Sequence, residues 1–106
     1  MEAGNVIEPD RMEGRELDRL VHERVLKLPA SENGEVLPYS TEWEHARQIR
    51  SECGPFVIEE AEDSYRAVVG VRQANGECLA AESWAPTRPL ALCRAALISA
   101  LAAERN

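Results

Sequence analysis

The segment from Thr87 to Glu104 constrains the fold more than any other part of the sequence. Thr87 suits an N-cap, since its hydroxyl can accept an unpaired backbone N–H, and Pro89 falls in the first turn, where a missing N–H costs little. Apolar residues then recur at helical spacing on two adjacent sides. One side carries Leu90, Cys93, Leu97, Ala100 and Leu101, and the other carries Ala91, Ala95, Ile98 and Ala102. A helix with two apolar sides must be covered twice, so we expect it to be central to the fold.

The second of these sides, which we call the small-residue seam, has two candidate partners. Its residues Ala91, Ala95, Ile98 and Ala102 would let a helix of a second copy approach closely, which makes a homodimer one alternative. The first helix of the same chain can occupy the seam equally well, and we favour this intramolecular packing.

Two helices are predicted before the strands. Residues 1–9 lack an apolar pattern and are expected to be a flexible lead to a single domain of residues 10–106. A D-x-x-E start at Asp10 opens the first helix. Its predicted apolar stripe is Leu17, Leu20, Val21, Val25 and Leu28, and its predicted water-facing side is Arg15, Asp18, Arg19, Glu23 and Lys27.

The second helix is predicted to follow a loop that extends to Pro38. Thr41 and Glu44 match a capping box at its start, and Gly54 followed by Pro55 would end it. The buried stripe of this short helix is predicted to be Trp43, Ala46, Ile49 and Cys53.

Three strands are predicted between the second helix and the last one. They comprise Phe56–Glu59, Tyr65–Arg72 and Cys78–Trp84, and Asn75-Gly76 suits a two-residue type I′ hairpin. That loop would pair Val71 with Ala80 and Ala67 with Trp84. Because the last two strands do not alternate cleanly, we expect helices on both faces of the sheet. The expected fold is α+β, an α/β/α sandwich around a short three-stranded antiparallel sheet, in the order α-α-β-β-β-α.

Acidic residues are concentrated in the first part of the chain. The formal net charge is −7, and residues 1–63 hold 16 Asp and Glu against 7 Lys and Arg. This excess argues against direct binding to nucleic acid, which requires a basic surface. Four acids at the end of the first strand are expected to be held rigidly: Glu59, Glu60, Glu62 and Asp63. They are a candidate surface for a basic protein, although the same residues could serve solubility alone.

The sequence contains no recognisable catalytic or metal-binding motif. His22 and His45 each lack a second ligand three or four residues away, and no nucleophile-elbow, phosphate-loop or zinc-protease pattern occurs. We therefore expect no enzymatic activity, no metal site and no cofactor. An enzyme of unrecognised type would become plausible if a histidine and a cysteine met in a pocket.

The cysteines and the apolar segments suggest where the protein acts. The N-terminus does not resemble a signal peptide, and the C-terminal apolar run, interrupted by Arg94 and Ser99, is too short to span a bilayer. Cys53, Cys78 and Cys93 are odd in number and lack C-x-x-C spacing. We expect three reduced thiols in a cytoplasmic protein without a membrane segment.

Three segments together resemble a known family. They are Gly14-Arg15-Glu16-Leu17-Asp18 with Leu20-Val21, then Pro38-Tyr39-Ser40-Thr41, and Pro89-Leu90-Ala91-Leu92-Cys93-Arg94-Ala95-Ala96-Leu97. Their order and spacing resemble the phage ABA-sandwich domain family over about residues 13–101. The resemblance implies an α/β/α sandwich encoded by a phage or prophage, and it brings no catalytic residues.

These observations favour two functions. The first is a non-enzymatic binding protein that meets a host or phage protein, for instance an anti-defence inhibitor whose acidic face covers a basic nucleic-acid site. The alternative is a structural or accessory phage protein that acts as a homo-oligomer through the small-residue seam.

Overall fold

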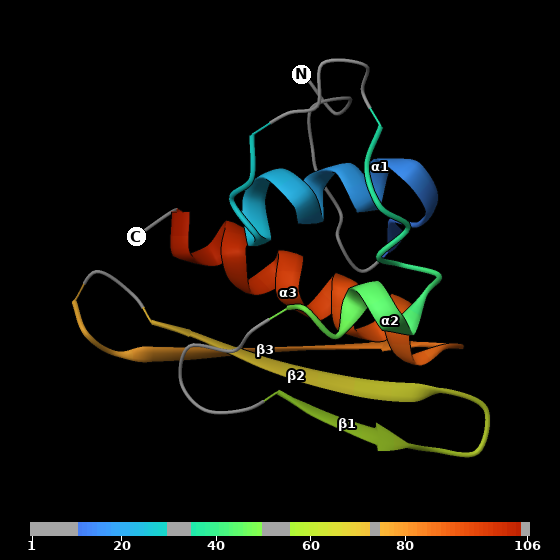
Figure 1. Cartoon of the computed structure of the whole chain (residues 1–106). Coiled ribbons are helices and arrows are strands. Elements are labelled where there is room, and N and C mark those ends of the chain that lie inside the picture. The colour runs from blue at the N-terminus through green and yellow to red at the C-terminus, as the bar shows by residue number, and fades with distance from the viewer. Residues whose placement is uncertain (1–10, 30–34, 50–55, 73–74, 105–106) are drawn as a thin grey trace, which may run out of the picture.

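The computed structural model describes residues 11–29, 35–49, 56–72 and 75–104. Its elements are α1 (Gly14–Leu20), the π-helix η3 (Val21–Val25), α2 (Trp43–Ala46), β1 (Val57–Glu60), β2 (Tyr65–Arg72), β3 (Cys78–Ala85) and α3 (Arg88–Glu104). The strands form one antiparallel sheet in the order β1-β2-β3 (Figure 1). The predicted α+β class and the predicted order of helices and strands are confirmed.

α3 is the central helix of the fold, as predicted. It begins directly after Thr87, whose Oγ1 accepts the Leu90 N–H at 3.4 Å and whose carbonyl accepts the Ala91 N–H at 3.0 Å. In Figure 1 one side of α3 lies along the sheet, and α1 with η3 lies over its other side. The helix is therefore buried around most of its circumference, at Ala91, Leu92, Cys93, Ala95, Ala96, Leu97 and Ser99.

The hairpin of β2 and β3 differs by one residue from the predicted register. Arg72 pairs with Cys78, so the connection comprises residues 73–77 and not Asn75 and Gly76 alone. Gly76 adopts a φ of 91°, and the Asn75 side-chain oxygen accepts the Glu77 N–H at 2.9 Å. The observed pairs are Ala67 with Ser83 and Val71 with Leu79. Because side chains alternate along a strand, this shift places Trp84 on the other face of the sheet from Ala67.

The described helices lie on one face of the sheet, which differs from the predicted helices on both faces (Figure 1). The strand residues that face α3 are buried, namely Ala67, Val69, Ala81, Ser83 and Ala85. The second apolar side of α3 is covered by η3 and α1, which pack on α3 and not on the sheet. Among the described elements, no helix remains for the other face.

The first helix differs from the prediction at both ends. α1 begins at Gly14, and the predicted start at Asp10 lies outside the described residues. After Leu20 the helix widens into η3, and Lys27 ends it with a left-handed φ of 54°. This turn directs Leu28 outward, where 43% of the residue is exposed, so its predicted place in the apolar stripe is wrong. The predicted stripe residues Leu17, Leu20 and Val21 are buried, and Val25 is partly buried.

α2 is a single turn, and it is shorter than predicted. The Thr41 hydroxyl donates to the Pro38 carbonyl at 3.4 Å, and the N-cap is Glu42 without a side-chain hydrogen bond, so the predicted capping box is wrong. The indole of Trp43 packs edge-on against Phe56 with ring centroids 6.1 Å apart, and 37% of Trp43 remains exposed. Trp43 is thus only partly a core residue. Ala46 and Ile49 are buried as predicted, and Cys53 lies outside the described residues.

Candidate functional site

The face of the sheet that points away from α3 combines exposed apolar and charged side chains. Cross-strand pairing arranges them in two rows: Glu59, Arg66 and Trp84 form one, and Val57, Val68 and Glu82 form the other. We call these six residues the open face. Trp84 is 51% exposed and Val57 is 46% exposed, the two highest values among the large hydrophobic residues in the described part of the chain.

Arg66 joins two carboxylates at the centre of the open face. Its Nη1 donates to Glu59 Oε1 at 2.7 Å, and its Nη2 and Nε donate to Glu82 Oε2 at 2.7 and 3.2 Å. The hydrogen bonds to Glu82 and then to Glu59 raise the pKa of Arg66 above its usual value, so its charge is permanent. Because the three residues come from three strands, the ion pairs fix their relative positions across the sheet.

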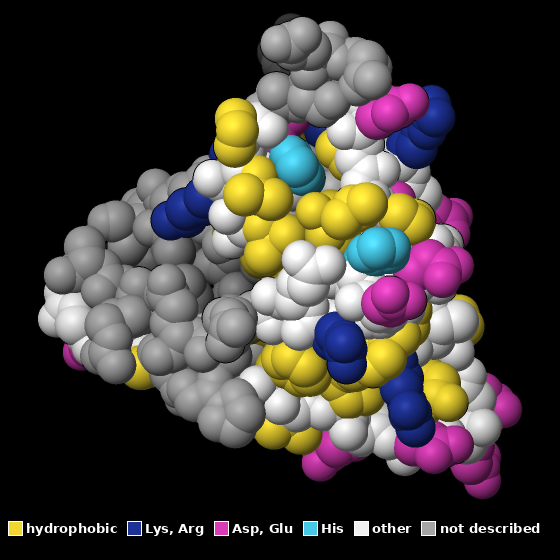
Figure 2. Space-filling model, in the orientation of Figure 1, with side chains coloured by type: hydrophobic (Ala, Val, Ile, Leu, Met, Phe, Trp, Pro, Cys, Tyr) yellow, Lys and Arg dark blue, Asp and Glu magenta, His cyan; other side chains and the backbone are white. Residues whose placement is uncertain are grey.

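The four acids predicted as a binding surface all lie at one end of the β1–β2 hairpin. Glu59 and Glu60 end β1, and Glu62 and Asp63 lie in the turn, which the Ala61 N–H closes by donating to the Ser64 carbonyl at 2.8 Å. All four are exposed. We call them the acidic turn, and Figure 2 shows acidic side chains gathered at this end of the molecule. Glu59 belongs to both groups, whereas Glu60, the next residue of β1, points to the opposite side of the sheet.

Of the open face, sequence reasoning named only Glu59, and the most exposed residue that it missed among the large hydrophobic ones is Trp84. The assumed two-residue loop paired Trp84 with Ala67, and helices were expected on both faces of the sheet, so no exposed indole was predicted. A usable signal was present in β3, where Ala81, Ser83 and Ala85 are small while Glu82 and Trp84 alternate with them. Glu82 and Trp84 are two positions apart and so lie on the same face of the strand, and a carboxylate beside a large aromatic residue indicates that this face meets solvent.

A buried carboxylate ties the first helix to the loop before α2. Asp18 is almost fully buried, and its Oδ1 accepts the Ser40 N–H at 2.7 Å. The prediction that Asp18 faces water is therefore wrong, since this helix position meets a loop and not solvent. The bond supplies a partner for a backbone donor that would otherwise be buried without one.

Beside this carboxylate, His22 and Tyr39 form a short chain of hydrogen bonds. His22 Nε2 donates to the Pro29 carbonyl at 2.9 Å, which leaves Nδ1 to accept the Tyr39 hydroxyl at 3.3 Å. Burial raises the pKa of Tyr39, and the nearby Asp18 and Cys93 add to the shift. Both ring nitrogens of His22 are thus used in holding the loop between η3 and α2.

The cysteines differ from the predicted set of three reduced thiols. Cys93 is a free thiol, but it is fully buried, and burial followed by the charge of Asp18 raises its pKa far above the usual range. A thiol in this state is not a nucleophile. Cys78 is disulfide-bonded, so the prediction is wrong for this residue. Cys53 lies outside the described residues.

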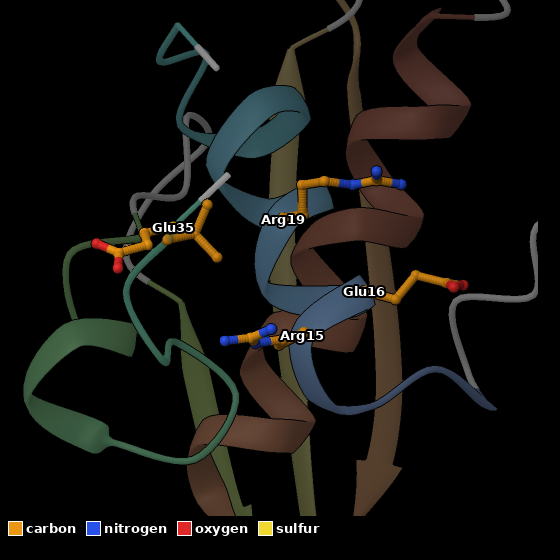
Figure 3. A pocket seen from close by; sticks show the side chains of 5 residues that line it. Arg15, Glu16, Arg19 and Glu35 are labelled. Carbon is orange, nitrogen blue, oxygen red and sulfur yellow. The ribbon is translucent and has the colours of Figure 1, made fainter. Parts of the chain in front are cut away.

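A surface hollow of about 510 Å³ lies between α1 and the segment after the first loop. Its lining comprises Arg15, Glu16, Arg19, Glu35 and Val36. In Figure 3 the labelled head groups spread apart and do not converge on one point. Such a lining offers no set of groups aimed at a common ligand atom.

Other predicted features can also be located. Ala91 and Ala95 of the small-residue seam are fully buried within the monomer, and Ile98 and Ala102 are partly buried. Within the described ranges, no three residues of the types His, Cys, Asp and Glu are grouped so that they could hold a metal ion. None of the described helices combines the length and apolar content that crossing a bilayer would require.

Comparisons with known proteins do not assign a function to this site. No protein-family model matches the chain, and neither a curated protein nor a solved structure matches it significantly.

Proposed function

We propose that this chain is a non-enzymatic binding protein of a phage or prophage, and that it inhibits a basic, nucleic-acid-binding host protein. In this proposal the acidic turn occupies the basic site of the target and competes with the phosphates of nucleic acid. The protein would act in the host cytoplasm, where such machinery works. The phage origin rests on the resemblance of the three sequence segments to the ABA-sandwich domain family.

The observation that carries this proposal is the placement of the acidic turn. Four carboxylates are exposed at the end of a hydrogen-bonded hairpin, so their mutual positions are held by β1 and β2. A rigid acidic cluster requires little ordering on binding and raises the local negative potential, which speeds encounter with a basic surface. The net charge of −7 acts in the same direction.

Two other observations support a binding protein over the alternatives. The only described free thiol is buried and held neutral, and His22 uses both ring nitrogens in structural hydrogen bonds. The seam that would join copies of a homo-oligomer is largely filled within the monomer, at Ala91 and Ala95. The structural or accessory role therefore has less support than the inhibitor.

The test compares two variants with equal loss of charge. One neutralises the acidic turn with Glu59→Gln, Glu60→Gln, Glu62→Gln and Asp63→Asn. The control neutralises four exposed acids on the helical side, Glu13→Gln, Glu16→Gln, Glu42→Gln and Glu44→Gln. The parent protein captures its target from host lysate, the target is identified by mass spectrometry, and its binding to labelled DNA or RNA is then measured by electrophoretic mobility.

The proposal expects the parent and the control to release nucleic acid from the target, and the acidic-turn variant to lose this effect. Binding should also weaken as the ionic strength rises, because exposed charges are screened. Equal inhibition by all three proteins at low and high salt would assign the acidic turn to solubility. A target whose nucleic-acid binding is unchanged by the parent would reject the inhibitor role.

A further inference from the structure

We propose that the open face binds an arginine side chain of the partner protein, with Trp84 as the stacking platform and Glu59 and Glu82 as carboxylate acceptors. This inference rests on the proposed function, and it specifies which residue type the partner presents. The site is separate from Glu60, Glu62 and Asp63, which would supply the longer-range attraction.

Trp84 is both exposed and firmly placed. About half of the residue is accessible to solvent, yet its backbone belongs to β3, one residue before the strand ends, and pairs with Arg66 in the β2–β3 ladder. From the other face, Arg94 of α3 donates from Nη1 to the Trp84 carbonyl at 3.4 Å and from Nε to the Met12 carbonyl at 2.9 Å. The indole is therefore presented on a rigid support, which limits the entropy lost on binding.

The two carboxylates of the open face keep acceptor capacity. Arg66 uses Oε1 of Glu59 and Oε2 of Glu82, so the second oxygen of each carboxylate has no hydrogen-bond partner among the described residues. Glu82 lies two residues before Trp84 on the same side of β3, which places the two about 7 Å apart along the strand. Arg66 lies between Glu59 and Trp84 in its cross-strand row, so Glu82 is the carboxylate nearer to the indole. Arg66 acts here as a positioning residue that holds both carboxylates on the open face.

An arginine fits this arrangement better than the other cations or a second copy. A guanidinium is planar and weakly hydrated, stacks on an indole, and can donate to carboxylates from several N–H groups at once, whereas an ammonium is a strongly hydrated point charge. The open face of a second copy would present two carboxylates and one guanidinium, so like charges would meet. The two chains would also each carry a net charge of −7. Charge complementarity therefore favours a basic partner segment.

The test uses a fluorescein-labelled octa-arginine peptide, with octa-lysine of equal length and charge for comparison. Fluorescence anisotropy gives the affinity of the folded parent and of each variant. In a Trp43→Phe background, Trp84 is the only indole, so its emission reports directly on occupancy of the site. Near-ultraviolet circular dichroism checks that each variant is folded, and sedimentation velocity checks that it is monomeric.

The proposal expects octa-arginine to quench Trp84 and to bind about two- to fivefold more tightly than octa-lysine. Trp84→Ala should weaken octa-arginine binding by a similar factor, and Trp84→Phe should retain most of it. Glu59→Gln and Glu82→Gln should each weaken binding more than Glu77→Gln, the matched control in the exposed β2–β3 loop.

Four outcomes would overturn the inference. If Glu77→Gln weakens binding as much as the open-face variants do, the peptide responds only to the overall acidity of the protein. An unchanged Trp84 emission would show that the peptide binds elsewhere. Equal affinity for the two peptides would show that the site does not select arginine. A dimer that Trp84→Ala dissociates would make a second copy the occupant.

The captured target separates this inference from the proposed function. If Trp84→Ala still inhibits the target while the acidic-turn variant does not, the arginine site fails and the inhibitor role stands. If the peptide results hold but no target is inhibited, the inhibitor role fails and the arginine site stands.

Discussion

The two faces of the sheet are built from the same strands, yet they have opposite surroundings. Toward α3 the strands present mostly small side chains, namely Ala67, Val69, Ala81, Ser83 and Ala85, all of them buried. On the open face they present larger and charged side chains, including Arg66, Glu82 and Trp84. Small side chains let a helix approach closely, whereas an ion pair and an indole remain favourable in water.

The difference separates the residues that stabilise the fold from the residues that stay exposed to solvent. The covered face removes apolar surface from water and supplies most of the driving force for folding. The open face adds little to that term, so its residues can change without loss of the fold. Substitutions on the covered face should therefore affect unfolding, and substitutions on the open face should affect binding.

The largest expected effect comes from removing α3. A chain that ends after Arg88 lacks the helix that covers the sheet on one side and supports η3 and α1 on the other. We expect this truncation to abolish cooperative thermal unfolding measured by circular dichroism. A sharp transition near the parental temperature would show that the covered face does not depend on α3.

A single cavity in α3 should have the next largest effect. Leu97 is fully buried, and Leu97→Ala is expected to lower the free energy of unfolding by about 2–5 kcal/mol in urea denaturation. Leu28→Ala is the matched control, because that leucine is largely exposed and its change should stay within about 0.5 kcal/mol. Similar costs at both positions would contradict the observed end of the first helix.

Asp18→Ala tests the polar part of the helix-covered side. The substitution leaves the buried Ser40 N–H without its acceptor, so we expect a loss of about 1–3 kcal/mol in the free energy of unfolding. Asp18→Asn keeps a side-chain oxygen in place and should retain more of the stability. If both variants unfold like the parent in urea, this hydrogen bond does not contribute.

Two adjacent alanines give the sharpest comparison of the two faces. Ala81 is buried beneath α3 and Ala80 is exposed, so Ala81→Leu should overpack the core and cost about 1–3 kcal/mol. Ala80→Leu should change the free energy of unfolding by less than about 0.5 kcal/mol. The opposite ranking in urea denaturation would favour the register of a two-residue hairpin loop.

Cys93 predicts a smaller, pH-dependent effect. Its pKa is raised in the folded state, so its contribution is present in full below the pKa of an unfolded thiol, about 8.5, and decreases as the pH rises above that value. Relative to Cys93→Ala, the parent should lose up to about 1.4 kcal/mol of stability per pH unit in this window. Melting temperatures of both proteins between pH 7 and 9.5 measure the difference. If the melting temperatures of the two proteins change equally with pH, the thiol ionises equally in the folded and the unfolded state.

Local signals in the sequence were sufficient for α3 and for the order of the elements. Thr87 and Pro89 mark the start of the last helix, and its two apolar sides predict burial on two sides, because both signals depend only on neighbours within a few turns. The acidic turn was located in the same way, since Glu59 and Glu60 directly follow a run of strand-forming residues. Its role in binding stays a prediction.

The sequence by itself determined the fold class, the central helix and the acidity of one end. The tertiary structure decided which face of the sheet is covered, because the hairpin register depends on a loop whose length no turn motif specifies, and one residue of shift moves Trp84 from the core to the surface. It also decided that Asp18 is buried and Leu28 exposed. These outcomes depend on which segments meet in space, and helical periodicity reports only that a side is apolar and not what covers it.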